Sequence, residues 1–235
     1  ARGLGAEVTV VEPLPTPLAR VLGPEIGAVI AEMHRDRGVE VRTGIGVESV
    51  IGDERVEAVT LSDGSQLAAD VVLVAIGVVP ETAWLEGSGL DLDDGVRCDA
   101  SLICGPGIVA AGDLARFPHP LAKAPVRFEH RTSAAEQGAH AAMSLLAGDD
   151  AEPFVMIPYF WSDQFGTKIQ SIGIPEPTDD VVVVAGSLEE HRFVACFGRE
   201  GRLSAAVGFS MPRDVMRFHP LLARNASFDE ALAAT

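Results

Sequence analysis

The feature that most constrains the fold is a strand, a helix and a second strand in succession within the first 43 residues. Residues 6–12, "AEVTVVE", are largely apolar and predict a buried strand that ends in the acid Glu12. In residues 23–38 the apolar side chains recur every three or four positions, the period of an amphipathic helix. Pro24 fits the first turn of this helix and Gly38 the position just after its end. With a next strand at residues 39–43, the order predicts a parallel α/β sheet.

More strands are expected in the following hundred residues. Residues 46–70 predict two or three short strands, with a hairpin turn at Asp63-Gly64. Residues 71–76 form a nearly continuous apolar run, which fits a strand covered on both faces and ended by Gly77. Another buried strand is predicted at residues 107–111. A helix is predicted between residues 130 and 148, with Thr132 or Ser133 as its cap, Glu136 near its third position and Gly148 at its end.

The pattern changes at about residue 153. From there to residue 210, short runs of β-branched and aromatic residues alternate with glycine turns, which predicts four or five antiparallel strands. A helical region is expected at about 212–234. The predicted fold class is therefore α/β, followed by a separate α+β domain with an antiparallel sheet.

Composition narrows the classes of function. The chain has 235 residues, 47% of them hydrophobic, which suits one or two globular domains. A net charge of −16 argues against nucleic acid as a partner. No apolar run reaches the roughly 18 residues of a membrane span, and no signal peptide is visible, so a cytoplasmic protein is expected. The three cysteines include no C-x-x-C pair, which disfavours a disulfide framework and a zinc site.

Charge is spread unevenly along the chain. Residues 1–100 hold seven arginines against 18 acidic residues, whereas residues 199–224 hold five arginines against two acids. The second segment is either a surface for an acidic partner or an ordinary solvated face.

Several residues could bind a cofactor. Glu12, at the end of a strand, can accept hydrogen bonds from the two ribose hydroxyls of NAD and would repel the 2′-phosphate of NADP, which favours NADH. Gly77 would let a flat cofactor lie against the backbone. Gly112 would do the same for a pyrophosphate, while Asp113 accepts a hydrogen bond from a polyol.

A second group of candidates surrounds the predicted helix at 130–148. Its first amides could face an anion, with Glu129, His130 and Arg131 beside them. The segment "YFWSDQFG", residues 159–166, gathers four aromatic side chains, among them Trp161, in a chain that is only 6% aromatic. Such a cluster suits a flat ring or a protein partner, or else a simple core.

Taken in order, the segments "VTVVE", "LVAIGVVPET", "GIVAAGD", "EHRTSAAEQGAHAA" and "FWSDQFGTKIQSIG" resemble the FAD- and NADH-dependent ferredoxin reductases, within the glutathione-reductase-like flavoproteins. The resemblance runs over essentially the whole chain, and "FWSDQ" is its most specific part. It implies partial Rossmann-like domains: the remainder of an NAD-binding domain at residues 1–78, the last segment of an FAD-binding domain at 79–152, and a C-terminal reductase domain at 153–235.

The resemblance also implies roles for single residues. Glu12 matches the family's adenosine-ribose acid, Gly77 the glycine near the nicotinamide, and Asp113 the acid at the flavin ribitol. Glu129 and His130 match residues at the flavin pyrimidine edge, and Trp161 a tryptophan near the isoalloxazine. Arg131 departs from the pattern, since many members have an aromatic residue there. The implied cofactors are FAD and NAD; no acid–base catalytic residue and no metal ligand is expected.

The implied activity is electron transfer from NADH through FAD to a ferredoxin-type [2Fe-2S] protein, with a monomer or a weak dimer both open. Other NADH-dependent flavoenzymes of the same group stay open as alternatives: disulfide reductases, nitrite-reductase-like enzymes and enzymes like apoptosis-inducing factor. A non-enzymatic fragment is a further alternative. The first strand and the Gly-rich turn that should precede "EVTVV" are not in the sequence, so we expect the chain alone to hold FAD poorly and to be a weak enzyme.

Overall fold

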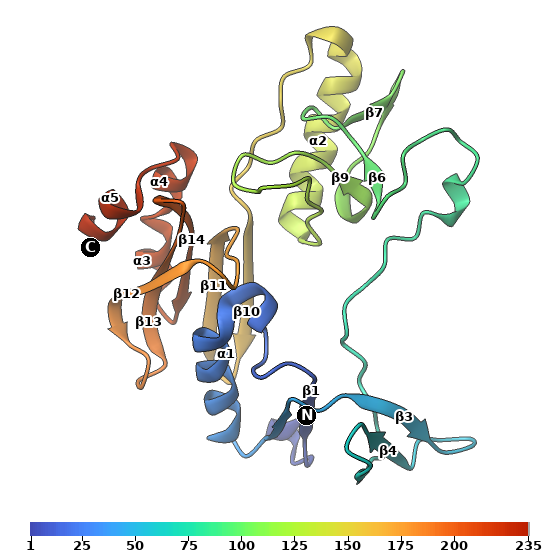
Figure 1. Cartoon of the computed structure of the whole chain (residues 1–235), viewed down its shortest axis with the longest axis vertical. Helices are drawn as coiled ribbons and strands as arrows, with labels where there is room; N and C mark the ends of the chain where they lie inside the picture. Colours follow the sequence, from blue (N-terminus) through green and yellow to red (C-terminus); the bar gives the residue numbers. More distant parts are fainter. Residues whose placement is uncertain (235) are drawn as a thin grey trace. The chain divides into compact units, whose positions relative to one another are not determined.

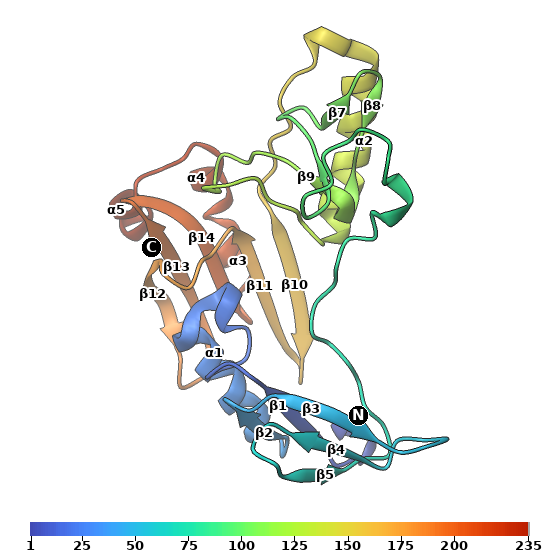
Figure 2. The same ribbon diagram turned by 45° about the vertical axis from the view of Figure 1, so that its right-hand side comes forward.

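The computed structural model describes residues 1–234, which form two compact units. The first comprises residues 1–76 with the loops 175–179 and 187–191, and the second comprises the rest. Figures 1 and 2 show the elements of each unit.

The first unit contains the predicted strand–helix–strand motif. A short 3-10 helix, η1 (Arg2–Leu4), precedes β1 (Thr9–Glu12), which is shorter than predicted. After α1 (Ala19–Arg35), β2 (Glu40–Thr43) returns parallel to β1, with Glu12 opposite Thr43. The expected β-α-β order is thus confirmed, and it places Glu12 at the carboxyl end of this two-stranded sheet.

Both ends of α1 follow from single residues. Gly23 adopts φ 75° and ψ 168°, so the helix is kinked there and its main part begins at Pro24, as predicted. At the other end Gly38 has φ 76°, and the N–H groups of Gly38 and Val39 donate to the carbonyls of Arg35 and His34. This is the Schellman motif, which needs a left-handed residue at that position.

A three-stranded antiparallel sheet follows in the same unit, formed by β3 (Val47–Ile51), β4 (Ala58–Leu61) and β5 (Gln66–Ala68). The predicted Asp63-Gly64 turn joins the last two strands. The Asp63 carboxylate accepts from the N–H of Ser65 at 2.9 Å, and Gly64 has φ 82°.

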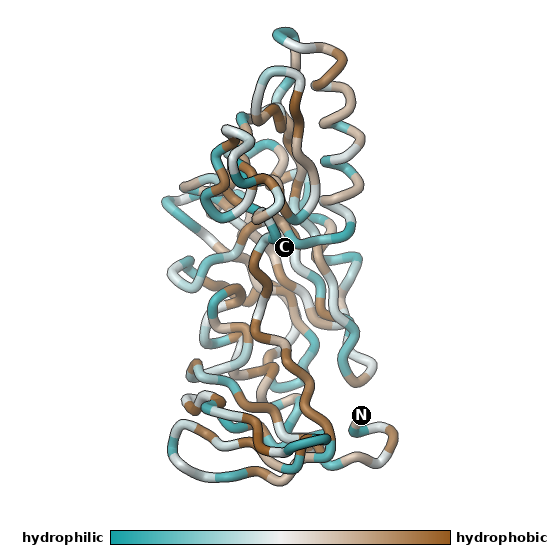
Figure 3. Tube along the Cα trace, turned by 90° about the vertical axis from the view of Figure 1, so that its right-hand side faces the viewer, coloured by the Kyte–Doolittle hydropathy of each residue, from teal (hydrophilic) through white to brown (hydrophobic). Residues whose placement is uncertain are grey.

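The predicted buried strand at residues 71–76 is wrong. The segment is extended but pairs with no strand of the described chain, and its side chains lie open, with Leu73 89% and Ile76 91% exposed. Figure 1 draws it as a plain trace, and Figure 3 colours the same stretch as strongly hydrophobic. A run without polar alternation predicts a strand only if sheet and helices cover both its faces. Within residues 1–234 neither covers this run.

The second unit begins with short elements around one long helix. These are η2 (Ala83–Leu85), β6 (Val96–Arg97), β7 (Ile103–Gly105), β8 (Ile108–Val109), η3 (Gly112–Leu114), β9 (Ala115–Arg116), α2 (Arg131–Ala147) and η4 (Gly148–Asp150). The strand predicted at 107–111 is therefore only the two residues of β8. Phe117 lies at the centre of the local core, with its ring edge-on to Phe128 and Phe154.

The start of α2 differs from the prediction. Its N-cap is His130, in extended conformation, and no side chain caps the helix. Thr132 does not cap because its hydroxyl donates instead to the carbonyl of Tyr159 at 3.3 Å. Ser133 accepts a hydrogen bond from Gln137 inside the helix. Gly148 ends the helix as predicted.

The C-terminal part of this unit is a five-stranded antiparallel sheet in the order β10-β11-β14-β13-β12. Its strands are β10 (Tyr159–Gln164), β11 (Thr167–Gly173), β12 (Asp180–Ser187), β13 (Arg192–Arg199) and β14 (Arg202–Phe209). The predicted helical region forms three short helices, α3 (Pro212–Met216), α4 (His219–Ala223) and α5 (Phe228–Ala233). Val215 of α3, Leu222 of α4 and Phe218 between these helices pack on the sheet to form a core. The expected fold class is confirmed. No helix formed by residues 1–234 is both long and apolar enough to cross a bilayer.

Candidate cofactor-binding site

Gly112 and Asp113 stand in the 3-10 turn η3, which begins three positions after the last residue of β8 and packs on α2. Gly112 has φ 79°, and a Cβ added there would meet only the Ala134 side chain, at 3.7 Å. The backbone is therefore open to a close neighbour, as predicted, although the positive φ alone also favours glycine. The Asp113 side chain is exposed and makes no hydrogen bond within residues 1–234, so its carboxylate can accept from a ligand.

Arg127 holds this region together, although the sequence reasoning did not single it out. Its guanidinium donates to the Asp113 carbonyl at 2.8 Å and to the Glu129 carboxylate at 3.0 Å. A third bond reaches Asp94 at 3.2 Å, and the arginine side chain is only 10% exposed. The buried cation thus fixes the backbone at Asp113 and one of the predicted acids, Glu129.

The N-terminus of α2 has backbone donors that no hydrogen bond within residues 1–234 uses. The first helical hydrogen bond is from the N–H of Ala134 to the carbonyl of His130, at 2.9 Å. The amides of residues 131–133 precede it, and no side chain caps them. Together with the helix dipole and the exposed Arg131 side chain, they make the site favourable for an electron-rich group.

His130 lies between the donors and the acids. Its ring is tilted against Phe128, with 6.0 Å between centroids, and against Phe160, with 5.5 Å. Burial lowers the pKa of His130, and the charges of Glu129 and Asp113 oppose that shift. Its Nδ1 is buried and has no hydrogen-bond partner within residues 1–234. An unpaired buried polar atom is costly, so this nitrogen fits a site that a ligand completes.

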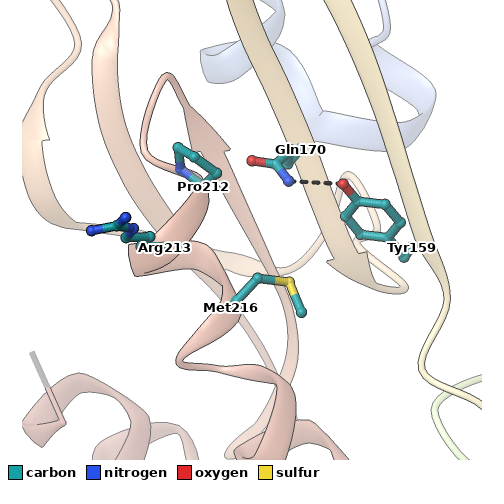
Figure 4. A pocket seen from close by; sticks show the side chains of 5 residues that line it. All are labelled: Tyr159, Gln170, Pro212, Arg213 and Met216. Carbon is teal, nitrogen blue, oxygen red and sulfur yellow. Dashed lines mark hydrogen bonds between the residues drawn. The ribbon is translucent and has the colours of Figure 1, made fainter.

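Trp161 lies on β10. The residue before it on the same strand, Phe160, is the one whose ring contacts His130. Its indole is 47% exposed and stacks on Tyr159, with 5.5 Å between centroids. The hydroxyl of Tyr159 accepts from the amide of Gln170 at 2.8 Å, and both line an open pocket of about 490 Å³ with three residues of α3 (Figure 4). The pocket adjoins the aromatic pair and does not coincide with the start of α2.

Glu12 lies in the first unit, and Gly77 is the first residue of the second unit. One carboxylate oxygen of Glu12 accepts from the N–H of Leu14 at 2.9 Å, which fixes the side chain at the carboxyl edge of β1. Gly77 does not end a strand, because residues 71–76 form none, and a Cβ added there would meet no atom within 4 Å. Only its φ of 95° favours glycine, so the structure gives Gly77 weaker support than the motif did.

The structure therefore brings together Gly112, Asp113, Glu129, His130 and Arg131, with Trp161 on the strand that contacts them. Sequence reasoning missed Arg127 and Gln137. Gln137 is fully buried and accepts from the N–H of Gly112 at 2.7 Å. Its spacing of four from Ser133 was a usable signal, since i,i+4 polar pairs meet on a helix.

The arginine-rich segment 199–224 is largely engaged within the chain. Arg199 donates to the carbonyls of Leu121 and Ile174, and Arg202 to that of Asn225. Arg217 and Arg224 pair with Asp214 and Glu230. Arg213 lines the pocket of Figure 4. This favours a structural role for most of these charges over a free basic surface.

Two sequence profiles match the chain. The one described as pyridine nucleotide-disulphide oxidoreductase matches residues 1–138, which is more than half of the 235 residues. The chain belongs to that oxidoreductase family. A second profile, reductase C-terminal, matches residues 159–235.

Several of the relatives that the chain matches are named ferredoxin reductases. The chain is 34% identical over 235 residues to the 5,5'-dehydrodivanillate O-demethylase ferredoxin reductase subunit of Sphingobium sp., covering 96% of this chain and 55% of that protein. Two solved structures agree. The ferredoxin reductase for the CYP199A2 system from Rhodopseudomonas palustris has TM-score 0.88 and 33% identity, over 96% of this chain and 56% of that one. Putidaredoxin reductase in its covalent complex with putidaredoxin has TM-score 0.85 and 30% identity, over 93% and 53%.

The resemblance to ferredoxin reductases is thus confirmed. The chain spans about half the length of the relatives it matches.

Proposed function

We propose that the protein is an NADH-dependent flavoprotein reductase that passes electrons to a ferredoxin-type [2Fe-2S] protein. The observation that carries the proposal is the uncapped start of α2, where unused amides, the unpaired Nδ1 of His130 and the carboxylate of Asp113 lie within one small region. The relatives named ferredoxin reductases support the acceptor.

The donors and acceptors present fit FAD. The α2 amides and Arg131 would face the electron-rich edge of its ring, and Asp113 would accept from a ribitol hydroxyl. When bound, FAD would supply the redox chemistry between NADH and the ferredoxin. The residues around it would orient its ring and stabilise negative charge at the helix N-terminus. Burial lowers the pKa of His130 and so favours its neutral ring, which adds a dipole and no charge.

Glu12 supports NADH as the donor. Leu14 occupies one oxygen of its carboxylate, and the other has no partner within residues 1–234. A carboxylate at that strand end accepts from ribose hydroxyls and repels a 2′-phosphate. Glu12→Ser is expected to lower kcat/KM for NADH and to narrow its advantage over NADPH. An unchanged preference for NADH over NADPH would show that Glu12 does not contact the nucleotide.

The activity test is anaerobic reduction of a [2Fe-2S] ferredoxin by the purified protein, with FAD and NADH supplied and the ferredoxin spectrum followed. Oxidised glutathione, nitrite and oxygen are offered separately as acceptors. Faster reduction of ferredoxin than of the others supports the proposal. Reduction of a disulfide or nitrite in preference to ferredoxin would replace this acceptor with one of the family's alternatives.

A matched pair of variants tests the site. The chain has two tryptophans, Trp161 at the site and Trp84 in η2, which is 71% exposed. Trp161→Leu is expected to slow ferredoxin reduction about tenfold or more, the loss expected when a stacking and positioning contact worth about 1.4 kcal/mol is removed. Trp84→Leu should leave the rate unchanged. Equal effects of the two substitutions would place Trp161 outside the site.

A further inference from the structure

Cys98 and Cys104 face each other across a tight turn. The N–H of Asp99 donates to the carbonyl of Ile103 at 2.8 Å, and the N–H of Leu102 closes the turn on the Asp99 carbonyl at 3.2 Å. The Asp99 carboxylate also accepts from the N–H groups of Ser101 and Ile103. One position beyond the Asp99–Ile103 pair on each side stands a cysteine. β7, which carries Cys104, can be seen beside β8 in Figure 2.

The turn brings the two thiols within hydrogen-bonding reach of each other, which is the proximity that a disulfide requires. A disulfide needs Cα atoms about 4.4–6.8 Å apart. The Asp99 turn fixes the two backbones, so bond formation requires rotation of side chains and little movement of the chain.

The thiols are neighbours in an apolar setting. Cys98 is buried, and Cys104 is partly exposed and packs against the same core. Burial raises the pKa of Cys98 to about 12, and the Cys104 thiol beside it adds to the shift. Burial also raises the pKa of Cys104, while its hydrogen bond with Cys98 lowers it. The Cys98 thiol donates to the Val96 carbonyl at 3.3 Å.

We propose that Cys98 and Cys104 are a modification site: a dithiol pair that a low-molecular-weight disulfide such as oxidised glutathione converts reversibly into an intrachain disulfide. Cys104 is the attacking residue because it alone of the two reaches solvent. Its thiolate attacks one sulfur of the small disulfide, forms a mixed disulfide and releases one thiolate. The Cys98 thiolate then attacks the Cys104 sulfur and expels the second small thiol. The protein loses two electrons and two protons, and the small disulfide is reduced to two thiols.

The pair adjoins the segment that leads to Asp113. The Cys104 thiol donates to the Ile108 carbonyl in β8 at 3.6 Å, and the N–H of Ala110 donates to the Leu102 carbonyl at 3.1 Å. Oxidation of Cys104 removes its hydrogen bond to the Ile108 carbonyl. The reaction of the thiol therefore changes a contact of β8, the strand that precedes η3. The proposal itself does not depend on the proposed electron transfer, because its readout is the mass of one peptide.

The test treats the native full chain with oxidised glutathione at pH 8, blocks free thiols with iodoacetamide under denaturing conditions, and analyses a tryptic digest without reductant. Trypsin cleaves after Arg97 and Arg116, so both cysteines fall in peptide 98–116. The expected result is a peptide lighter by two hydrogens, unalkylated and restored by dithiothreitol. Cys196, fully buried on β13, is the internal control and should remain fully alkylated.

Two variants test the order of attack. Cys98→Ser should trap glutathione on Cys104 as a stable mixed disulfide, whereas Cys104→Ser should leave Cys98 unmodified over the same time. The proposal is overturned if wild-type peptide 98–116 is recovered doubly alkylated, or if it carries glutathione without losing two hydrogens. Because that readout uses the wild-type chain, it stands even if a variant fails to fold.

Discussion

The side-chain carbonyl of Gln137 accepts a hydrogen bond from the backbone N–H of Gly112 at 2.7 Å, and its amide donates to the Ser133 hydroxyl at the same distance. Gln137 and Ser133 are fully buried. One side chain of α2 therefore holds η3, and with it Asp113, against the helix whose N-terminus faces the candidate site. The relative placement of these predicted site residues therefore depends on Gln137, to which the sequence motifs assigned no role.

Replacement of Gln137 tests this connection. Gln137→Leu leaves the Gly112 N–H and the Ser133 hydroxyl buried without partners, so the free energy of unfolding should fall by about 1–3 kcal/mol. Glu136→Leu is the control, because Glu136 is exposed on the same helix and should change stability by less than about 0.5 kcal/mol. Urea unfolding followed by circular dichroism measures both. Equal stability of the two variants would show that the Gln137 bonds add nothing.

Gly38 and Gly138 should respond oppositely to alanine. Gly38 has φ 76° after α1, where a residue with a Cβ costs about 1–2 kcal/mol, so Gly38→Ala should destabilise the chain. Gly138 lies inside α2 with no atom within 4 Å of an added Cβ, so Gly138→Ala should stabilise it by about 0.5–1 kcal/mol. Chemical unfolding of both variants measures whether each substitution raises or lowers the free energy of unfolding. A stabilising Gly38→Ala would contradict the Schellman assignment.

The exposed run at residues 71–79 should make the chain prone to self-association. Seven of its nine residues are large and apolar and at least partly exposed, and an unpaired apolar segment of this kind recruits other strands. Leu73→Lys with Ile76→Lys should raise solubility and reduce binding of an apolar fluorescent dye, with stability unchanged. Leu4→Lys, 92% exposed but isolated, is the control. Light scattering that stays the same in the double variant would argue against this segment as the cause.

Stability should fall as the pH drops below about 6.5. Burial lowers the pKa of His119 below 6.5, although its bond to the Met156 carbonyl at 2.8 Å opposes the shift. The neutral ring accepts the N–H of Leu121 on Nδ1, and protonation would abolish that bond. Because the unfolded chain then binds the proton more tightly, the free energy of unfolding decreases as the pH falls through about 6.5.

His130, with a pKa lowered by burial, should act in the same direction. Urea unfolding at pH 5 and pH 7 measures the slope, and His119→Gln should make it shallower. An identical slope in the variant would assign the pH dependence to other groups.

Local patterns in the sequence determined the elements whose stability is local. The apolar period of residues 23–38 and the turn glycine Gly38 predicted α1 because both act within a few residues. Asp63-Gly64 predicted its hairpin for the same reason. The motifs around Asp113, His130 and Trp161 identified the family and the residues to examine, because their chemistry is carried by residue type and order.

Tertiary structure decided what depends on partners distant in sequence. Residues 71–76 have the composition of a buried strand, yet a strand exists only where another strand offers its hydrogen bonds. Thr132 was predicted to cap the helix, but its hydroxyl donates to the backbone carbonyl of Tyr159, 27 residues away. Gln137 and Arg127 acquire their partners Gly112 and Asp113 only on folding, because hydrogen bonds depend on distance in space. The sequence alone records only distance along the chain.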